Sequence, residues 1–396
     1  MSALPPLDPL DADAPLRGVE VLELAGEYSG YAGKLLSDLG AAVTRVSVTS
    51  ETIVEPARPL DGASIDPAPL FLHRGKRDLL LNLELEHDRS ELDRLVGVSD
   101  IVLQSAGADA SSGQIGADEI RALNASAIHV ILTPFGLDGP AAGYVSADLV
   151  RQAAGGLLWL GGYPDTEPIA AFGDQSTLAT GIFGAVAALI ALAERDRSGE
   201  AHAVEVSSQE VLTQALETSL AEYEFTGRVQ RRIGDVPREA GSGVFACKDG
   251  YVSMVAGRLG TAEAWKRLRT WLVEEQIPEA ESLWDEGWDE LAFRRNPEAV
   301  ARFTSIFEDF ASRHGKQELY LEAQRRSIAL APVNSLDDVL GDVQLAARDS
   351  IVEVRDPATD ASGRVPGAPF RISPLGPEPD AIALSDAAET AATPPR

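Results

Sequence analysis

The sequence lacks the residues on which several classes of protein depend. It has one cysteine, Cys247, in 396 residues, which excludes an internal disulfide and a zinc site built from cysteines. We expect this thiol to be a small buried hydrophobe. No cluster of metal ligands stands out along the chain, so no metal is expected.

Positive charge is also scarce. The chain has 34 Lys and Arg residues against 62 Asp and Glu residues, a formal net charge of -28. Because nucleic acid is repelled by such a surface, it is not an expected partner. A polyanionic small molecule would need local basic residues or helix N-termini to overcome the same field.

Targeting and membrane signals are missing as well. The first 15 residues are acidic and Pro-rich and lack the basic start of a signal peptide. Small or charged residues interrupt the apolar runs, as they do in a soluble core. We therefore expect a cytoplasmic protein that does not engage a membrane.

The first half of the chain repeats a strand and helix pattern. Residues 16–48 predict a strand, a turn, a helix and a second strand at 42–48. A short helix is predicted at 90–96, and further strands are predicted at 99–104 and 128–132. This order is typical of an α/β fold with right-handed connections. The first turn lacks the Gly-x-Gly-x-x-Gly fingerprint, so a nicotinamide dinucleotide is not expected.

The second half predicts a smaller unit, since a chain of 396 residues is long enough for two. Residues 241–254 hold two short strands around an Asp-Gly turn, which indicates a hairpin. A long helix is predicted over 209–226, and helical patterns fill 261–326. Their apolar residues at helical spacing are expected to form a core: Trp265, Leu268, Leu272, Phe303, Ile306, Phe307 and Phe310.

One acidic residue, Asp174, precedes a long apolar helix that is predicted to run until residues 194–199. The carboxylate has two compatible roles at this position. It can cap the helix by accepting hydrogen bonds from the first-turn N–H groups. It can also be a nucleophile that these donors and the helix dipole keep ionised.

A second feature is a basic segment at residues 73–77, which places four potential cations before a predicted strand. The segment is either a solvated turn or a contact for phosphate or adenosine, for which Arg and Lys are the usual partners.

The order of three segments, 148–162, 172–181 and 194–207, resembles that of the family III CoA-transferases, the carnitine dehydratase and bile-acid-inducible protein family. The resemblance implies that Asp174 is the catalytic nucleophile. It implies an α/β fold with a Rossmann-like large domain, a parallel sheet and a smaller α+β domain. It also implies an interlocked homodimer whose active sites gather residues from both subunits.

The resemblance also implies the division of the chain. It predicts a leader at 1–15, a large CoA-binding domain at 16–208, a helical linker at 209–235, a small domain at 236–328, a return to the large domain at 329–375 and an acidic, Pro-rich tail at 376–396.

Coenzyme A, bound as an acyl-CoA co-substrate, is the implied cofactor. Four segments of this chain, together with Arg45, stand where the family contacts CoA. The predicted contact residues are Glu27, Tyr28, Ser29, Arg45, Arg74, Lys76, Arg77, Leu81, Asn82, Gln104, Ser105, Ala106, Thr133, Pro134, Phe135 and Gly136.

The chain departs from the family in two of these segments. Residues 104–108 replace the family's Asn-Phe-Arg-Pro-Gly and so lack its aromatic ring and cation. Pro134 removes a backbone N–H that a ligand would otherwise use. The glycine run of the formyl-CoA transferase lid is missing around Gly241 and Gly243, which argues against formate or oxalate as substrate.

The predicted reaction transfers CoA from an acyl-CoA to a carboxylic acid through acyl-aspartyl and aspartyl-CoA intermediates on Asp174. The loops at 26–29 and 133–136 are candidates for the N–H donors that stabilise the oxyanions. Two alternatives remain open at this point. One is a 2-methylacyl-CoA racemase or isomerase, for which Ser146 and Ala147 stand where a racemase has a histidine base. The other is a non-catalytic acyl-CoA-binding relative.

Overall fold

A six-stranded parallel sheet organises the first half of the molecule. The structure is a computed structural model that describes residues 14–48, 67–107, 115–257, 262–355 and 362–372. The strands, in the order β3-β2-β1-β4-β5-β6, are β1 (Glu20–Leu24), β2 (Ala42–Val48), β3 (Arg77–Leu81), β4 (Ile101–Ser105), β5 (Ile128–Thr133) and β6 (Ala203–Ser207). This is the strand order of the doubly wound nucleotide-binding folds, so the predicted parallel sheet is confirmed.

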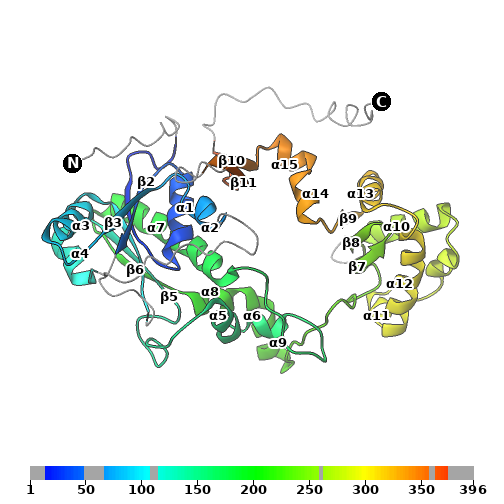
Figure 1. Cartoon of the computed structure of the whole chain (residues 1–396). Helices are drawn as coiled ribbons and strands as arrows, with labels where there is room; N and C mark the ends of the chain where they lie inside the picture. The colour runs from blue at the N-terminus through cyan, green and yellow to red at the C-terminus, as the bar shows by residue number, and fades with distance from the viewer. Residues whose placement is uncertain (1–13, 49–66, 108–114, 258–261, 356–361, 373–396) are drawn as a thin grey trace, which may run out of the picture.

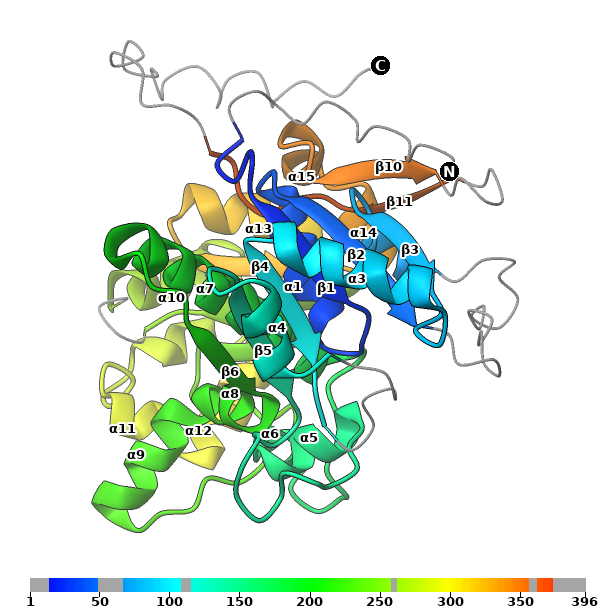
Figure 2. The same cartoon turned by 90° about the vertical axis from the view of Figure 1, so that its left-hand side faces the viewer.

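Each face of this sheet has its own apolar core, because successive side chains of a strand point to opposite faces. On β1, Val21 packs into the core beneath α1 (Ser29–Asp38) and α7 (Gln175–Ser198), whereas Leu22 packs into the core beneath α3 (Glu86–Val98) and α4 (Ala117–Leu123). Figure 2 shows α3 and α4 crossing in front of the sheet. The predicted helix at 90–96 is longer at both ends than the pattern indicated.

The long helix α7 is apolar enough, by length and composition, to cross a membrane. In this structure half of its most apolar window is buried, and the helix packs against α1 and β5. Close packing depends on glycine, since a Cβ at Gly181 would lie 2.7 Å from the Cβ of Tyr31 and one at Gly184 would lie 2.5 Å from Leu132. These contacts are those of a core helix.

The described residues of the first half also form five further short helices. They are α2 (Pro67–Leu72), α5 (Asp148–Ala154), α6 (Leu157–Leu160), α8 (Ser208–Thr213) and α9 (Glu217–Thr226). Of these, α5 and α8 contact α7. The predicted continuous helix over 209–226 is wrong: a 3₁₀ turn at Gln214–Leu216 divides it. α8 packs through its buried residues Val211 and Leu212, whereas α9 has no buried residue. Packing therefore does not keep the two helices on a common axis.

A second, antiparallel sheet builds the smaller part of the molecule. It has the order β7-β8-β9, with β7 (Ser242–Cys247), β8 (Gly250–Val255) and β9 (Ala329–Pro332). The predicted hairpin is confirmed, and Gly250 at its turn has φ +146°. The strand β9 pairs with β8 although its residues were predicted to open the return segment. Cys247 is partly buried against the core of this sheet.

Helices cover one side of this sheet and share an aromatic core with it. They are α10 (Ala262–Glu274), η2 (Ala280–Trp284), α11 (Leu291–Arg294), α12 (Pro297–Ala311) and α13 (Lys316–Arg325). All seven core residues predicted at helical spacing are buried. At the centre, Phe307 lies 5.0 Å from Phe245 and 5.8 Å from Phe303, measured between ring centroids.

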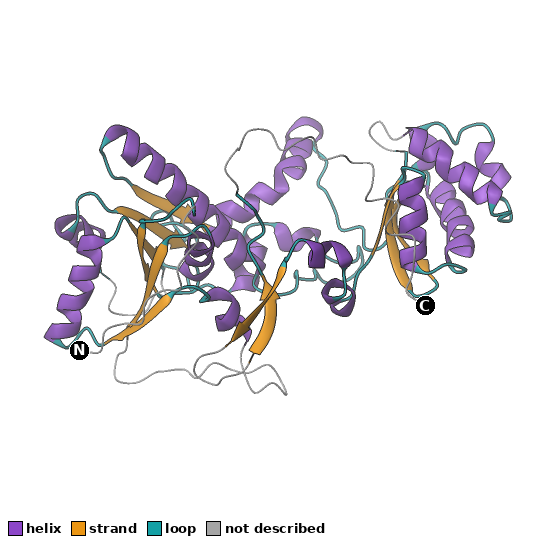
Figure 3. Cartoon of the chain, turned by 90° about the horizontal axis from the view of Figure 1, so that it is seen from above, coloured by secondary structure: helices purple, strands orange, loops and turns teal. Residues whose placement is uncertain are grey.

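The two parts are joined by two separate stretches of chain, after α9 and after β9 (Figure 1). Seen from above, the small sheet and its helices lie at the opposite end of the molecule from the parallel sheet (Figure 3). The returning chain forms α14 (Leu336–Leu340), α15 (Val343–Ala347), β10 (Ile351–Arg355) and β11 (Ser362–Pro366). Residues 1–13 of the predicted leader and the whole predicted tail lie outside the described residues.

The aromatic core gives a stability prediction. We expect Phe307→Ala to lower the free energy of unfolding of the small part by about 3–5 kcal/mol, because the truncation leaves a cavity between packed rings. Urea unfolding followed by tryptophan fluorescence measures this, since four of the five tryptophans (265, 271, 284 and 288) lie there. The exposed Leu321, on a helix of the same part, is the control, and Leu321→Ala should change stability by less than about 0.5 kcal/mol.

Candidate active site

The helix α7 begins at Gln175, and Asp174 is its N-cap residue, as the sequence predicted. The side chain of Asp174 nevertheless accepts no capping hydrogen bond and is exposed. The predicted capping role is therefore wrong. A different carboxylate, that of Asp148 at the start of α5, accepts hydrogen bonds from the backbone N–H groups of Ser176 (2.9 Å) and Thr177 (3.2 Å).

Several contacts keep the Asp148 carboxylate in place to cap α7. Its carboxylate also accepts hydrogen bonds from the Ser176 hydroxyl and from Gln152 Nε2, and it lies 3.6 Å from the guanidinium of Arg151. Partial burial opposes ionisation, but these hydrogen bonds and the arginine charge prevail and hold the pKa of Asp148 below its usual value. The N-terminus of α7 is thus capped by an ionised side chain from another helix.

Arg151 is the centre of the polar contacts around this cap. Its guanidinium is completely buried. It donates hydrogen bonds to Ser176 Oγ (2.9 Å), Thr177 Oγ1 (2.9 Å), Tyr28 Oη (3.0 Å), Ser146 Oγ (3.1 Å) and Glu27 Oε1 (2.5 Å). The sequence analysis missed this residue as a functional candidate. The available signal was the spacing of Asp148, Arg151 and Gln152, which places all three on one side of a helix.

The turn at 26–29 lies against Ser105, at the end of β4. Ser105 Oγ accepts hydrogen bonds from the backbone N–H groups of Tyr28 (3.1 Å) and Ser29 (3.0 Å). The approach is close, since a Cβ at Gly26 would lie 2.5 Å from that of Ser105. β1 and β4 are neighbours where the strand order reverses, and ligands of open α/β sheets bind in the crevice there. The fold brings these predicted contact residues together at that point.

The loop after β5 reaches the same edge of the sheet. Pro134 lies 2.9 Å from the position that a Cβ on Gly107 would occupy. Thr133 is buried, and its hydroxyl accepts a hydrogen bond from the N–H of Gly136 (2.9 Å). The ring of Phe135 packs edge-on against Tyr144. Ala106 joins the two loops through a hydrogen bond from its N–H to the carbonyl of Leu132.

Several predicted oxyanion donors are already used within the protein. The N–H groups of Tyr28 and Ser29 bind Ser105, and that of Gly136 binds Thr133. Gln104 is also engaged, because its side chain contacts the carbonyl of Ile115 (3.2 Å) and the ring of His129 (2.7 Å). Burial lowers the pKa of His129 to about 4. These contacts hold the side chain of Gln104 against the residues around it.

The predicted basic segment lies apart from this network, beside β2 and β3. Lys76 is buried and donates to Glu23 Oε2 and to the carbonyl of Gly30, both at 2.7 Å. Burial raises the pKa of Glu23 to about 7 against the opposing charge of Lys76. Lys76 therefore has no surface to offer a phosphate.

The other cations of the segment, and Arg45 on the neighbouring strand β2, are partly accessible. Arg74 pairs with Asp38 (3.2 Å), and Arg45 pairs with Asp78 (3.1 Å). Arg77 begins β3 and is half-buried. At the other end of this strand, Leu81 is buried, and the amide oxygen of Asn82 accepts a hydrogen bond from the N–H of Glu84.

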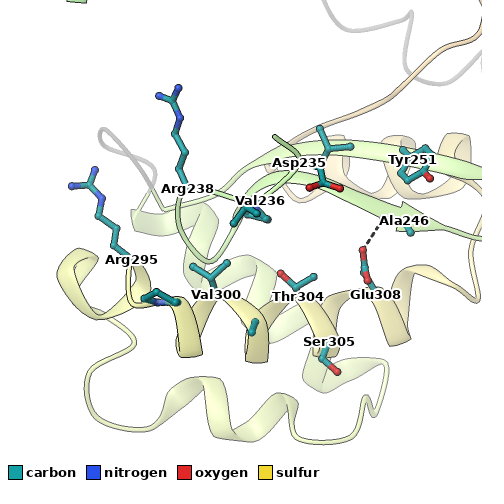
Figure 4. A pocket seen from close by; sticks show the side chains of 14 residues that line it. Asp235, Val236, Arg238, Ala246, Tyr251, Arg295, Val300, Thr304, Ser305 and Glu308 are labelled. Carbon is teal, nitrogen blue, oxygen red and sulfur yellow. Dashed lines mark hydrogen bonds between the residues drawn. The ribbon is translucent and has the colours of Figure 1, made fainter. Parts of the chain in front are cut away.

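A groove of about 770 Å³ lies elsewhere, on the small part of the molecule (Figure 4). Residues 235–238, the strands β7 and β8 and the helix α12 line it. None of the predicted contact residues lies in this groove. Among the described residues, no group of three or more His, Cys, Asp or Glu side chains is arranged to hold a metal ion.

Comparison with known proteins gives a consistent result. The family model of CoA-transferase family III matches residues 16–381. The succinyl-CoA:(R)-benzylsuccinate CoA-transferase subunit of Thauera aromatica is 29% identical over 90% of this chain and 87% of its own length. The succinate–glutarate CoA-transferase of Agrobacterium fabrum is 26% identical over 86% of this chain and 85% of its own.

A solved structure shares the fold. The crystal structure of a CAIB/BAIF family protein from Brucella suis superposes with a TM-score of 0.74, at 25% identity, over 91% of this chain and 93% of the other.

The capping contact gives a pH prediction. Because the pKa of Asp148 is lower in the folded than in the unfolded chain, its contribution to stability is present above the unfolded value of about 4 and is lost as the pH falls through the folded pKa. We expect wild-type protein to lose more of its unfolding free energy between pH 6 and pH 3 than Asp148→Asn loses. Urea midpoints across that range test this, and parallel curves for the two proteins would contradict it.

Proposed function

Because the chain belongs to CoA-transferase family III and is a CoA-transferase enzyme, we propose that it moves CoA between two carboxylic acids by covalent catalysis on Asp174. Its substrates are an acyl-CoA and a small carboxylic acid. The resemblance of the sequence to the family supports the choice of Asp174, and the geometry at the start of α7 adds an independent argument.

That geometry is the observation that carries the proposal. An Asp at an N-cap normally satisfies the first-turn N–H groups itself. Here Asp148 accepts those hydrogen bonds, so Asp174 keeps the N-cap position while its exposed carboxylate makes no capping bond. The arrangement thus presents an anion that is available to react and not needed to hold the helix.

The proposed reaction begins with attack of an Asp174 carboxylate oxygen on the thioester carbon of the acyl-CoA. The carbon–sulfur bond breaks, CoA thiolate leaves, and a mixed anhydride remains on Asp174. The thiolate then attacks the aspartyl carbonyl carbon, which forms an aspartyl-CoA thioester and releases the donor as its carboxylate. No water or redox partner is consumed in either step.

The second half of the reaction reverses this order with the acceptor acid. The acceptor carboxylate attacks the aspartyl-CoA thioester and displaces CoA thiolate, which gives a second mixed anhydride. Attack of the thiolate on the acyl carbon of that anhydride forms the new acyl-CoA and returns Asp174 as a carboxylate. Each step exchanges one activated acyl bond for another, so the barriers are lower than in direct exchange between two acids.

We propose that CoA binds along the carboxyl edge of the parallel sheet, across the switch point between β1 and β4. The turn at 26–29 and the loops at 105–107 and 133–136 meet there. Of the predicted basic contacts, Arg45, Arg74 and Arg77 retain partly accessible side chains, so they are the candidates for the phosphates. Lys76 is not among them because its ammonium is buried against Glu23.

We also propose that the working enzyme is a homodimer. Large apolar side chains are exposed near the candidate site, among them Phe172, which is 98% exposed two residues before Asp174. A stripe on α7, Ile182, Val186 and Ile190, is also exposed. Apolar surface that gathers in this way is typical of an interface. A partner subunit covering it would also exclude water from the reactive intermediates.

The nucleophile assignment predicts the kinetics of Asp174→Asn. We expect the rate of CoA transfer to fall at least about 10⁴-fold, the scale seen when a residue of a covalent catalytic unit is removed. The fold should survive, since Asp148 holds the helix cap. Transfer of isotopically labelled CoA from succinyl-CoA to a panel of dicarboxylates measures the rate.

The control is Asp165→Asn, which removes an exposed carboxylate in the segment before α7. It should transfer CoA at the wild-type rate. If Asp174→Asn retained more than a tenth of the wild-type rate while folded, the nucleophile assignment would be wrong.

The dimer proposal predicts a solution mass of twice the 42.0 kDa chain mass. Light scattering coupled to size exclusion measures it. We expect Ile190→Asp, which places a charge on the exposed stripe of α7, to shift the population toward the single-chain mass. A wild-type mass of one chain at micromolar concentration would exclude the dimer.

A further inference from the structure

A buried cation, Arg151, contacts the first turn of α7 just after the proposed nucleophile, and the transfer chemistry leaves it without a role. Arg151 has no exposed surface, although a charged group leaves water only at a cost of several kcal/mol unless it is paired and hydrogen-bonded. Here every nitrogen of the guanidinium donates a hydrogen bond. Two carboxylates, Glu27 at 2.5 Å and Asp148 at 3.6 Å, supply the opposite charge.

These contacts join parts of the chain that are distant in sequence. One set binds Glu27 and Tyr28, in the turn after β1. A second set binds Ser176 and Thr177, in the first turn of α7. The two sets also touch each other, because the Thr177 hydroxyl donates to Glu27 Oε1 at 3.3 Å. Arg151 thus fixes the distance between the turn at 26–29 and the helix end that carries Asp174.

We propose that Arg151 is a positioning residue for CoA transfer, which sets the geometry between the turn at 26–29 and the carboxylate of Asp174. The inference rests on the proposed function, because it takes Asp174 as the nucleophile. Arg151 does not touch substrate, since its guanidinium is enclosed by protein atoms. Its effect is to hold the turn at 26–29 and the Asp174 carboxylate at the right separation before a thioester binds.

Only arginine can make this set of contacts. The guanidinium offers five donors in a rigid plane, and the five hydrogen bonds to side chains run in directions that the plane allows. A lysine would keep the charge that balances Glu27 and Asp148 but would offer three donors from a single point. Arg151→Lys therefore separates the geometric role from the electrostatic one.

The test measures kcat and KM for CoA transfer in Arg151→Lys and Arg151→Ala. We expect kcat per folded molecule to fall about 100-fold in both, because a misplacement of about 1 Å in an active site has an effect of that size. KM for the acyl-CoA should change less than threefold. Added guanidinium ion should restore at least a tenth of the lost rate in Arg151→Ala and should not stimulate wild-type enzyme.

Arg269→Lys is the matched control for loss of a buried arginine. Arg269 is also completely buried, and it pairs with Asp289 (2.7 Å) and contacts the carbonyl of Leu283 (2.9 Å) in the small part of the molecule. The control variant should lose thermal stability and keep the wild-type kcat per folded molecule. Circular dichroism and the melting temperature establish the folded fraction for all variants.

The outcomes are distinct. If both Arg151 variants kept the wild-type kcat per folded molecule, or lost it only in proportion to the unfolded fraction, Arg151 would have a structural role alone and the inference would be overturned. A kcat loss in Arg151→Ala without guanidinium rescue, together with a wild-type kcat in Arg151→Lys, would also overturn it, because charge and not geometry would then matter. Failure of the proposed function is seen separately, as equal transfer rates in wild type and Asp174→Asn.

Discussion

The hydrogen bonds from the first turn of α7 to Asp148 are the interaction on which the candidate site depends. They satisfy N–H groups that every helix leaves unpaired at its start, and they do so with a side chain from a different helix. Asp174, the residue at the N-cap position, is therefore not needed to cap the helix. The carboxylate of Asp174 can be exposed because Asp148, which is partly buried, hydrogen-bonded and held ionised, caps the helix in its place.

Charge balance explains why the site needs Arg151. Asp148 and Glu27 place two carboxylates around one helix end, and the dipole of α7 offsets only part of their charge. A fully desolvated guanidinium supplies the remaining positive charge where solvent cannot screen it. The chain as a whole has no such balance, because its net charge is -28. Binding a polyanionic cofactor has to rely on local features: helix ends, backbone turns and the few cations at the edge of the sheet.

Much of the fold could be predicted from the sequence because its signals are local. Strand alternation located β2 over residues 42–48, and the Asp-Gly turn located the hairpin of β7 and β8. The division of residues 209–226 into two helices could not be predicted, because it depends on which helix finds a packing partner. The pairing of β9 with β8 is likewise a long-range contact that no local pattern encodes.

The candidate site was predictable in its position and not in its contacts. The turn at 26–29, Ser105 and the loop at 133–136 were matched to a known family and do meet at one edge of the sheet. The pairing of Lys76 with Glu23, more than 50 residues earlier, could not be seen in the sequence. The sequence also could not show that Asp148, and not Asp174, caps α7. Both are aspartates, which suit a helix N-terminus by residue type, so only the three-dimensional structure distinguishes them.

The most direct test of this account is peptide mass spectrometry of wild-type enzyme quenched after mixing with a panel of acyl-CoA thioesters. The account predicts a mass increase equal to CoA less one water on the peptide that contains residue 174, and its removal by hydroxylamine with formation of the aspartyl hydroxamate at that residue. A CoA thioester at any other carboxylate, or turnover in which no carboxylate becomes labelled, would contradict it.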